Sequence, residues 1–175
     1  LKDFMKTLYP ESINGVTTKE TFVKIDTDVY KGQFTTKGAT LFRLKYKKLI
    51  GWDPAIEKLE MMNALASISQ NSKLKPFLIT FNNKISRIPI YTFDKNASEK
   101  MTNDKHLVKV FYIRYWNKGK IFKLTKIFKI TKTNYVFNLS IKIENESTTQ
   151  QRIVSTDGLP QTSFYLHYGT GLGQY

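Results

Sequence analysis

The chain has 175 residues, of which 41% are hydrophobic, 9 are Gly and 5 are Pro. This length fits a single domain, and the composition excludes collagen-like, low-complexity and disordered chains. Basic residues outnumber acidic ones 28 to 14, a formal net charge of +14, and the absence of Cys excludes disulfides, Cys-ligated zinc, iron–sulfur sites and thiol catalysis.

We interpret the basic excess as a solvated surface, or as the composition that an AT-rich genome encodes, rather than as a sign of nucleic-acid binding. Only four of the 28 basic residues are Arg, whereas recognition of bases and phosphates favours the Arg fork. An anionic membrane surface is the second interpretation and nucleic acid the third. No apolar run reaches the roughly 18 residues of a membrane-spanning helix. The chain starts at Leu1 without a signal region and stops at Tyr175 after a Gly-rich stretch, so we expect a piece of a larger protein.

The first third of the chain predicts two strands. Pro10 and Gly15 indicate a lead-in loop over 1–18. Alternation then predicts a strand over 20–30, a break at Lys31-Gly32, a turn at Lys37-Gly38 and a second strand over 39–48. The side chains predicted to share the inner face of each strand are Thr21, Val23, Ile25, Thr27 and Val29 in the first, and Thr40, Phe42, Leu44 and Tyr46 in the second.

Residues 53–69 predict the main helix of the chain. Asp53 suits the N-cap, Pro54 the first helical position, and apolar residues from Ile56 to Ile68 recur at helical spacing. We interpret the pair Met61 and Met62 as core filler rather than as a binding surface.

From Pro76 onward the pattern returns to strands. Residues 77–81 and 84–93 predict a hairpin with its turn at Asn82-Asn83, and Pro89 makes the second arm an edge or a bulge. A polar loop over 94–105 precedes a meander whose strands span 106–116, 120–131 and 135–144. Further strands are predicted at 151–155 and 163–168. In the third meander strand we expect Tyr135, Phe137, Leu139, Ile141 and Ile143 to face inward and to form the central core strand.

These elements predict a mainly β fold, with two large antiparallel sheets packed face to face and one inserted helix near 53–69. We expect helix to be confined mostly to that segment. No βαβ alternation and no internal repeat is visible.

The residues that bear chemistry do not assemble a site by sequence. His106 and His167 lie far apart, each in a predicted strand, and are interpreted as structural. Asp26 and Asp28 share a strand face and suit an acid–base pair, but Lys24 can simply neutralise them. The run Gly169, Gly171 and Gly173 lacks the spacing of a nucleotide-binding loop and predicts a tight turn. We therefore expect no catalysis, no metal and no cofactor.

The segment 105–142 carries ten basic residues and no acidic one, interleaved with aromatic residues. That mixture suits a stacking platform for single-stranded nucleic acid. However, Phe122, Leu124, Phe128 and Ile130 share one face of the predicted strand with Lys126, while Lys123 and Lys129 lie on the other. The pattern therefore favours a core face with lysines on the wet side.

Three segments, in order, resemble the large periplasmic domain of the YidC membrane protein insertases. They are Lys24–Tyr30 with the turn and strand that run on to Leu44, Thr125–Phe128 with the stretch from Tyr135 to Ser147, and the end from Phe164 to Gly173. Residues 51–105 depart most from the family pattern and are interpreted as a variable insertion with a helix and a hairpin.

The resemblance implies a β-supersandwich, related to that of sugar mutarotases, over residues 19–175. It also implies that residues 1–18 follow a first membrane helix, and that the domain lies in the periplasm as part of a bacterial inner membrane protein. The implied function is a non-catalytic scaffold or docking role in an insertase that inserts and folds membrane proteins, alone or with the Sec translocon. The implied partners are Sec components and nascent membrane proteins. From the charge itself we expect weak, salt-sensitive contact of some lysines of 105–142 with anionic lipid and, because Arg is scarce, no specific nucleic acid. We also expect a monomer.

Two other classes of function remain open from the residues. A carbohydrate-binding sandwich needs an aromatic groove with paired carboxylates, for which the 14 acidic residues show no obvious set. A basic single-strand nucleic-acid binder is favoured only by the charge and by aromatic residues such as Tyr115 and Trp116.

Overall fold

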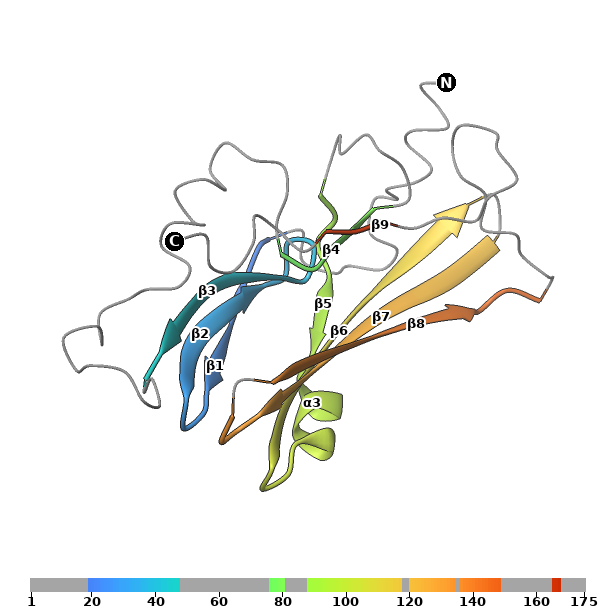
Figure 1. Ribbon diagram of the computed structural model, residues 1–175. Helices are drawn as coiled ribbons and strands as arrows, with labels where there is room; N and C mark the ends of the chain where they lie inside the picture. Colours follow the sequence, from blue (N-terminus) through green and yellow to red (C-terminus); the bar gives the residue numbers. More distant parts are fainter. Residues whose placement is uncertain are drawn as a thin grey trace.

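The computed structural model of the chain describes residues 19–47, 76–80, 88–117, 120–134, 136–148 and 165–167. The described elements, in chain order, are β1 (Phe22–Asp26), β2 (Tyr30–Thr35), β3 (Thr40–Tyr46), β4 (Leu78–Thr80), β5 (Thr92–Asp94), α3 (Lys95–Met101), β6 (His106–Asn117), β7 (Lys120–Thr131), β8 (Phe137–Asn145) and β9 (Tyr165–His167). They form antiparallel sheets in the orders β1-β2-β3, β4-β9 and β5-β6-β7-β8 (Figure 1). The predicted mainly β class is confirmed.

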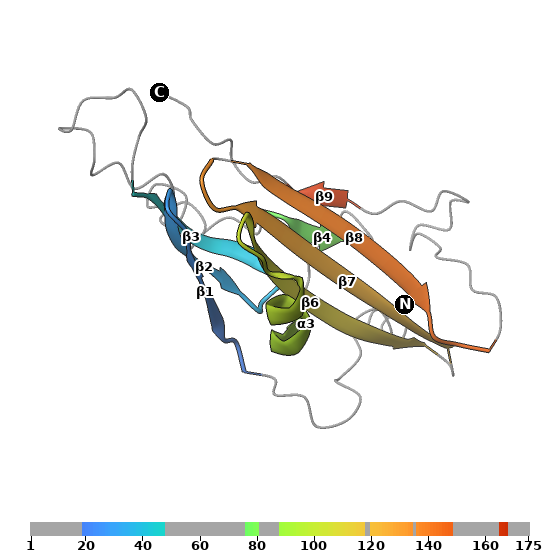
Figure 2. The same ribbon diagram turned by 90° about the horizontal axis from the view of Figure 1, so that it is seen from below.

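The three-stranded and four-stranded sheets pack face to face, as the sequence predicted, and Figure 2 shows them as two layers. Phe34 of β2 lies at the centre of the interface, with ring centroids 5.7 Å from Phe111 of β6 and 4.3 Å from Phe128 of β7. All three rings are buried. Aromatic pairs at these separations contribute both buried area and favourable ring geometry, so this trio joins the two sheets.

The turn between β1 and β2 lies earlier than the sequence predicted. Thr27 N donates to Tyr30 O at 2.9 Å, and Tyr30 N donates to Thr27 Oγ1 at the same distance, so the chain reverses over 27–29. The predicted break at Lys31-Gly32 is wrong, because Gly32 lies inside β2 opposite Ile25 and Leu44. A Cβ at Gly32 would lie 2.4 Å from Arg43 O, so this glycine allows close approach of β3 rather than a turn.

Strand β3 carries a β-bulge opposite β2. Gln33 pairs with Arg43 and Phe34 with Leu41, which leaves Phe42 as an extra residue. Because a bulge interrupts the two-residue period, Phe42 is exposed while Leu41 and Leu44 are buried. The predicted inward position of Phe42 is therefore wrong. Thr21 is also exposed, whereas Val23, Ile25, Thr27 and Val29 are buried as predicted.

The predicted hairpin of 77–81 with 84–93 is also wrong, because its described parts pair with other strands. Strand β4 pairs with β9, and β5 pairs with β6. Pro89 precedes an isolated bridge between Lys37 and Ile90, and Pro89 O accepts from Gly38 N at 2.7 Å. Pairing over such separations depends on which strands meet in space, and alternation does not carry that information.

A short helix, α3, replaces most of the loop predicted over 94–105. Asp94 caps its N-terminus, accepting from Ala97 N at 2.9 Å. The helix lies beside β6 (Figure 1), where Ser98 Oγ accepts from Val110 N and Thr102 Oγ1 accepts from Val108 N, both at 2.9 Å. These side chains accept from β6 donors at and beyond the end of its pairing with β5, so they cover part of the β6 edge that β5 leaves unpaired. The expectation that helix would be confined mostly to 53–69 is wrong for this segment.

The predicted meander is confirmed, with β6 and β7 paired from His106↔Thr131 to Asn117↔Lys120 and β8 paired along β7. The prediction that the third meander strand is the central core strand is wrong, since β8 lies at the edge of the described sheet and β7 in its interior. The inward side chains of β8 (Phe137, Leu139, Ile141 and Ile143) are only partly buried. On β7, in contrast, Leu124, Phe128 and Ile130 are fully buried.

Several predicted features lie outside the described residues. They are the lead-in over 1–18, the helix over 53–69 with Met61 and Met62, the turn at Asn82-Asn83, Tyr135, the strand over 151–155, and the glycines at 169, 171 and 173. Strand β9 lies within the predicted 163–168 strand.

Candidate functional site

Lys126 is the most unusual polar side chain that the structure describes. It sits in the middle of β7 on the core face, with none of its surface exposed. Its Nζ donates to Gly38 O and Phe77 O, each at 2.6 Å, and to Ala39 O at 3.3 Å. The same Nζ lies 5.0 Å from the centroid of the Tyr91 ring, a cation–π distance. An ammonium has three donors, so three carbonyl oxygens match its capacity.

Burial lowers the pKa of Lys126 to about 7. The cause is desolvation, because transfer of an ammonium out of water disfavours its charged form. The three carbonyl oxygens oppose this effect by accepting from the charged form. No ion pair in the described part of the chain involves Lys126. The amine is therefore held by backbone dipoles and a ring face rather than by a carboxylate.

Lys126 ties β7 to the turn between β2 and β3. Gly38 in that turn has φ +73°, a conformation that glycine adopts without strain, and Ala39 follows with φ 45°. Gly38 N donates to Pro89 O, and Tyr91 N donates to Thr36 O at 2.8 Å, so the turn is fixed from two directions. The arrangement brings together backbone from three distant parts of the chain. Its direct effect is to fix the end of the β2–β3 hairpin over the core.

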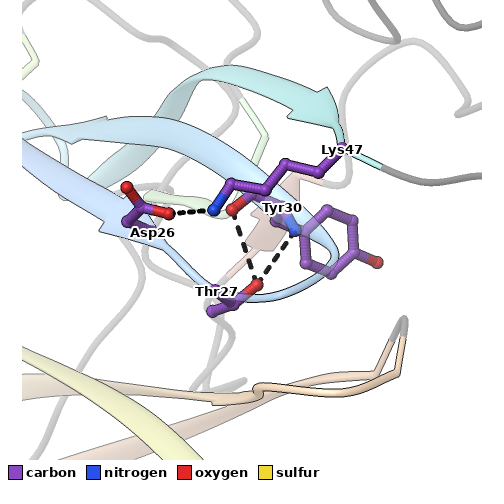
Figure 3. Close-up of polar contacts among 4 residues, drawn as sticks. All are labelled: Asp26, Thr27, Tyr30 and Lys47. Atoms are coloured by element: carbon purple, nitrogen blue, oxygen red, sulfur yellow. Dashed lines mark hydrogen bonds and ion pairs between the residues drawn. The ribbon is translucent and has the colours of Figure 1, made fainter.

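The carboxylate pair suggested by the sequence does not form a paired site. Asp26 is exposed and forms an ion pair with Lys47 at the end of β3, not with Lys24 (Figure 3). The hydrogen bond from Lys47 is the main reason why the pKa of Asp26 is lowered. Figure 3 also shows the adjacent Thr27–Tyr30 turn between β1 and β2. Because Asp26 ends β1 and Lys47 follows β3, the ion pair joins the two outer strands of the three-stranded sheet beside that turn.

The two histidines lie in different sheets. His106 begins β6, and desolvation together with the charges of Lys129 and Lys105 lowers its pKa. His167 ends β9, where its backbone pairs with Leu78 of β4. Across the described ranges, no three His, Asp or Glu side chains gather as a metal site would require.

The basic segment 105–142 is divided between two faces, as alternation predicted. Lys126 points into the core with Phe111 and Phe128, which are buried and offer no stacking surface. On the outer face, Arg114 forms an ion pair with Glu146 at 2.6 Å and Lys142 with Glu144 at 2.8 Å. Tyr112 lies between the cations of Arg114 and Lys123, at 5.3 and 5.0 Å. Two glutamates beyond the segment therefore neutralise part of its charge.

The sequence did not single out an exposed aromatic pair on the other sheet. Phe22 of β1 and Phe42 of β3 have ring centroids 4.8 Å apart. In β1, Phe22 lies on the same face as Lys24 and Asp26, and the bulge in β3 brings Phe42 to that face as well.

The described helix α3 has seven residues, and no helix within the described ranges is long and apolar enough to cross a membrane. A family model described as YidC periplasmic domain matches residues 22–169. This match agrees with the resemblance carried by the three sequence segments. No curated protein and no solved structure matches the chain.

Proposed function

The chain belongs to the YidC periplasmic domain family, and on this premise we propose that it is a non-catalytic scaffold and docking domain of a membrane protein insertase. Family membership associates the chain with an insertase and with the periplasmic side of an inner membrane protein. The match over residues 22–169 is the observation that carries the proposal, since it covers all described strands. We further propose a single domain over 19–175 that acts as a monomer, after a lead-in over 1–18.

The geometry supports a structural role for the side chains that could have done chemistry. Lys126 is enclosed and bonded to backbone carbonyls, and Asp26 is engaged by Lys47. A general acid or base must instead reach a substrate. In the proposed role, exposed sheet faces would contact Sec components and nascent membrane proteins, while the membrane part of the protein would carry out insertion.

Complementation tests the non-catalytic part of this proposal. The natural full-length protein would be expressed in cells depleted of their own insertase, with Asp26→Asn and His106→Ala as site variants. We expect both variants to support growth and substrate insertion at wild-type levels. Loss of insertion in either variant, at normal protein level and with a folded domain, would show that a titratable side chain takes part in the function.

Site-specific photo-cross-linking tests the docking part. A photoreactive residue would replace Gln33 on the three-stranded sheet or Lys129 on the four-stranded sheet, again in the full-length protein. We expect cross-links to Sec components or to nascent membrane proteins from at least one face. Absence of such products from both faces, while insertion proceeds, would contradict a docking role.

A further inference from the structure

The outer face of the three-stranded sheet carries exposed aromatic surface. Phe22 and Phe42 are 49% and 37% exposed, and their rings are in contact at 4.8 Å between centroids. Thr35 of β2 lies between β1 and β3 in the register, opposite Phe22 and Thr40, and both threonines are fully buried. The two rings therefore stand together on a closed, well-packed part of the sheet.

Cationic side chains flank this pair on the same face. Lys24, Gln33 and Arg43 form the next row of the register across β1, β2 and β3, and Lys24 and Arg43 are exposed. Lys31 follows on β2 beside Asp26. We call Phe22, Lys24, Lys31, Phe42 and Arg43 the Phe22–Phe42 surface.

Two acidic groups lie near this surface. Asp26 forms an ion pair with Lys47, whereas Glu20 Oε1 accepts a hydrogen bond from the neutral hydroxyl of Thr35 at 2.5 Å and keeps its charge. No ion pair within the described residues involves Lys24, Lys31 or Arg43. With Asp26 paired to Lys47, the three cations of the surface exceed the single carboxylate of Glu20, so a net positive charge lies beside the exposed rings.

We propose that the Phe22–Phe42 surface binds the surface of an anionic phospholipid bilayer. Aromatic side chains partition into the boundary between headgroups and acyl chains, while Lys and Arg contact lipid phosphates. Two rings offer far less than the roughly 1,200 Å² of a stable protein interface, so a fluid lipid surface suits them better than a rigid protein partner. The inference does not depend on the docking role proposed above.

The four-stranded sheet is less suited to this contact. Lys126 is buried, and Arg114 and Lys142 are engaged by Glu146 and Glu144. Its outer face therefore presents fewer free cations than the sequence suggested. This difference between the two sheets provides matched controls.

Co-sedimentation of the 175-residue chain with phosphatidylcholine vesicles, with and without phosphatidylglycerol, tests the proposal. We expect binding only to the anionic vesicles, with release at about 0.5 M salt, where the Debye length is only a few ångströms. The double variant Phe22→Ser/Phe42→Ser should bind about tenfold more weakly, since it removes roughly 1.4 kcal/mol of ring insertion. Lys24→Glu/Arg43→Glu should weaken binding similarly.

Two controls test whether binding depends on this surface rather than on any exposed apolar side chain or on the net charge of the chain. Val136→Ser removes an apolar side chain that is 47% exposed elsewhere, and Lys129→Glu reverses an exposed charge on β7. Both should bind anionic vesicles like wild type, and far-UV circular dichroism would verify that every variant is folded. Wild-type affinity in the double Phe variant, an equal loss with Lys129→Glu, or binding to acidic soluble proteins in preference to vesicles would overturn the proposal.

Discussion

A single lysine in the core shows how a polar side chain can supply hydrogen-bond donors to buried backbone carbonyl groups. Lys126 shares its strand face with Leu124 and Phe128, yet its Nζ reaches carbonyl oxygens of Gly38 and Phe77 at 2.6 Å. Buried carbonyl groups need donors, and a long side chain can supply several from one position. The cost is the desolvation of an ammonium, which lowers the pKa of Lys126 to about 7. The side chain thus couples the proton equilibrium of one residue to the stability of the whole sandwich.

This coupling predicts that stability depends on pH through Lys126. In the unfolded chain the amine has an ordinary pKa near 10.5, so between pH 7 and 10.5 the unfolded state binds more protons than the folded state. The free energy of unfolding should therefore rise with pH in this window, by on the order of 1 kcal/mol per pH unit from this site. Urea unfolding between pH 7 and about 9.5 would show a steeper rise for wild type than for Lys126→Met.

The exposed Lys129 supplies the control for this measurement. It lies three residues away on β7 with its side chain on the wet face, so Lys129→Met should retain the wild-type slope. Equal slopes for wild type and Lys126→Met would show that the buried amine has no such effect on stability.

A second effect at the residue scale concerns Gly32. A Cβ at this position would lie 2.4 Å from a backbone oxygen of β3, and backbone cannot yield as a side-chain end can. We expect Gly32→Ala to lower the free energy of unfolding by about 1–3 kcal/mol, the usual cost of overpacking. Urea titration would measure it, with Gln33→Ala, a partly exposed neighbour, as the small-effect control. A change within about 0.5 kcal/mol for Gly32→Ala would contradict the close approach.

At the scale of elements, position in the sheet decides how much an inward side chain contributes. Strand β7 has a partner on each side, whereas β8 pairs on one side within the described sheet. Leu124 of β7 is accordingly fully buried, and Leu139 of β8 only partly. Alternation is cleaner in β8 than in β7, where Lys126 lies among the inward apolar residues, so a regular pattern does not identify the more buried strand.

This difference predicts unequal costs of truncation. Leu124→Ala should lower the free energy of unfolding by about 2–5 kcal/mol, the range for large-to-small changes in a core. Leu139→Ala should cost only about 1–2 kcal/mol, because its site is open to solvent and to rearrangement. Lys142→Ala, on the outer face of β8, should stay within about 0.5 kcal/mol. If urea unfolding showed the same loss in free energy of unfolding for both leucine variants, β8 would be as central to the core as β7.

At the scale of the whole molecule, a net charge of +14 acts on a two-layer sandwich. The described ion pairs engage four basic residues, which leaves much of the excess on the surface. Like charges held together in a compact state repel one another, and salt screens that repulsion within a Debye length of ~10 Å at 0.1 M.

Added sodium chloride should therefore stabilise the fold. We expect the melting temperature to rise by about 2–4 °C between low salt and about 0.3 M, which corresponds to roughly 1 kcal/mol for a chain of this size. Thermal unfolding followed by circular dichroism would measure the shift, with Lys24→Glu/Lys129→Glu as a variant of lower net charge. A melting temperature that falls with salt, or a variant as salt-sensitive as wild type, would argue that repulsion is not limiting.

Four features could be predicted from the residues because each depends on a local two-residue period or on the turns that bound it. They are the mainly β class, the limits of β6 and β7 to within one residue, the inward face of β8 and the core-facing position of Lys126. The family was also visible in three short segments, and the family model confirmed it. Other features emerged only from the packed fold: β4 pairs with β9, β8 lies at the edge of the described sheet, and Phe42 joins Phe22 through a bulge. It also decided what Lys126 binds, since its acceptors lie 88, 87 and 49 residues away in the chain. Alternation reports which side of a strand a residue occupies, whereas partners across such separations depend on which surfaces meet when the two sheets pack.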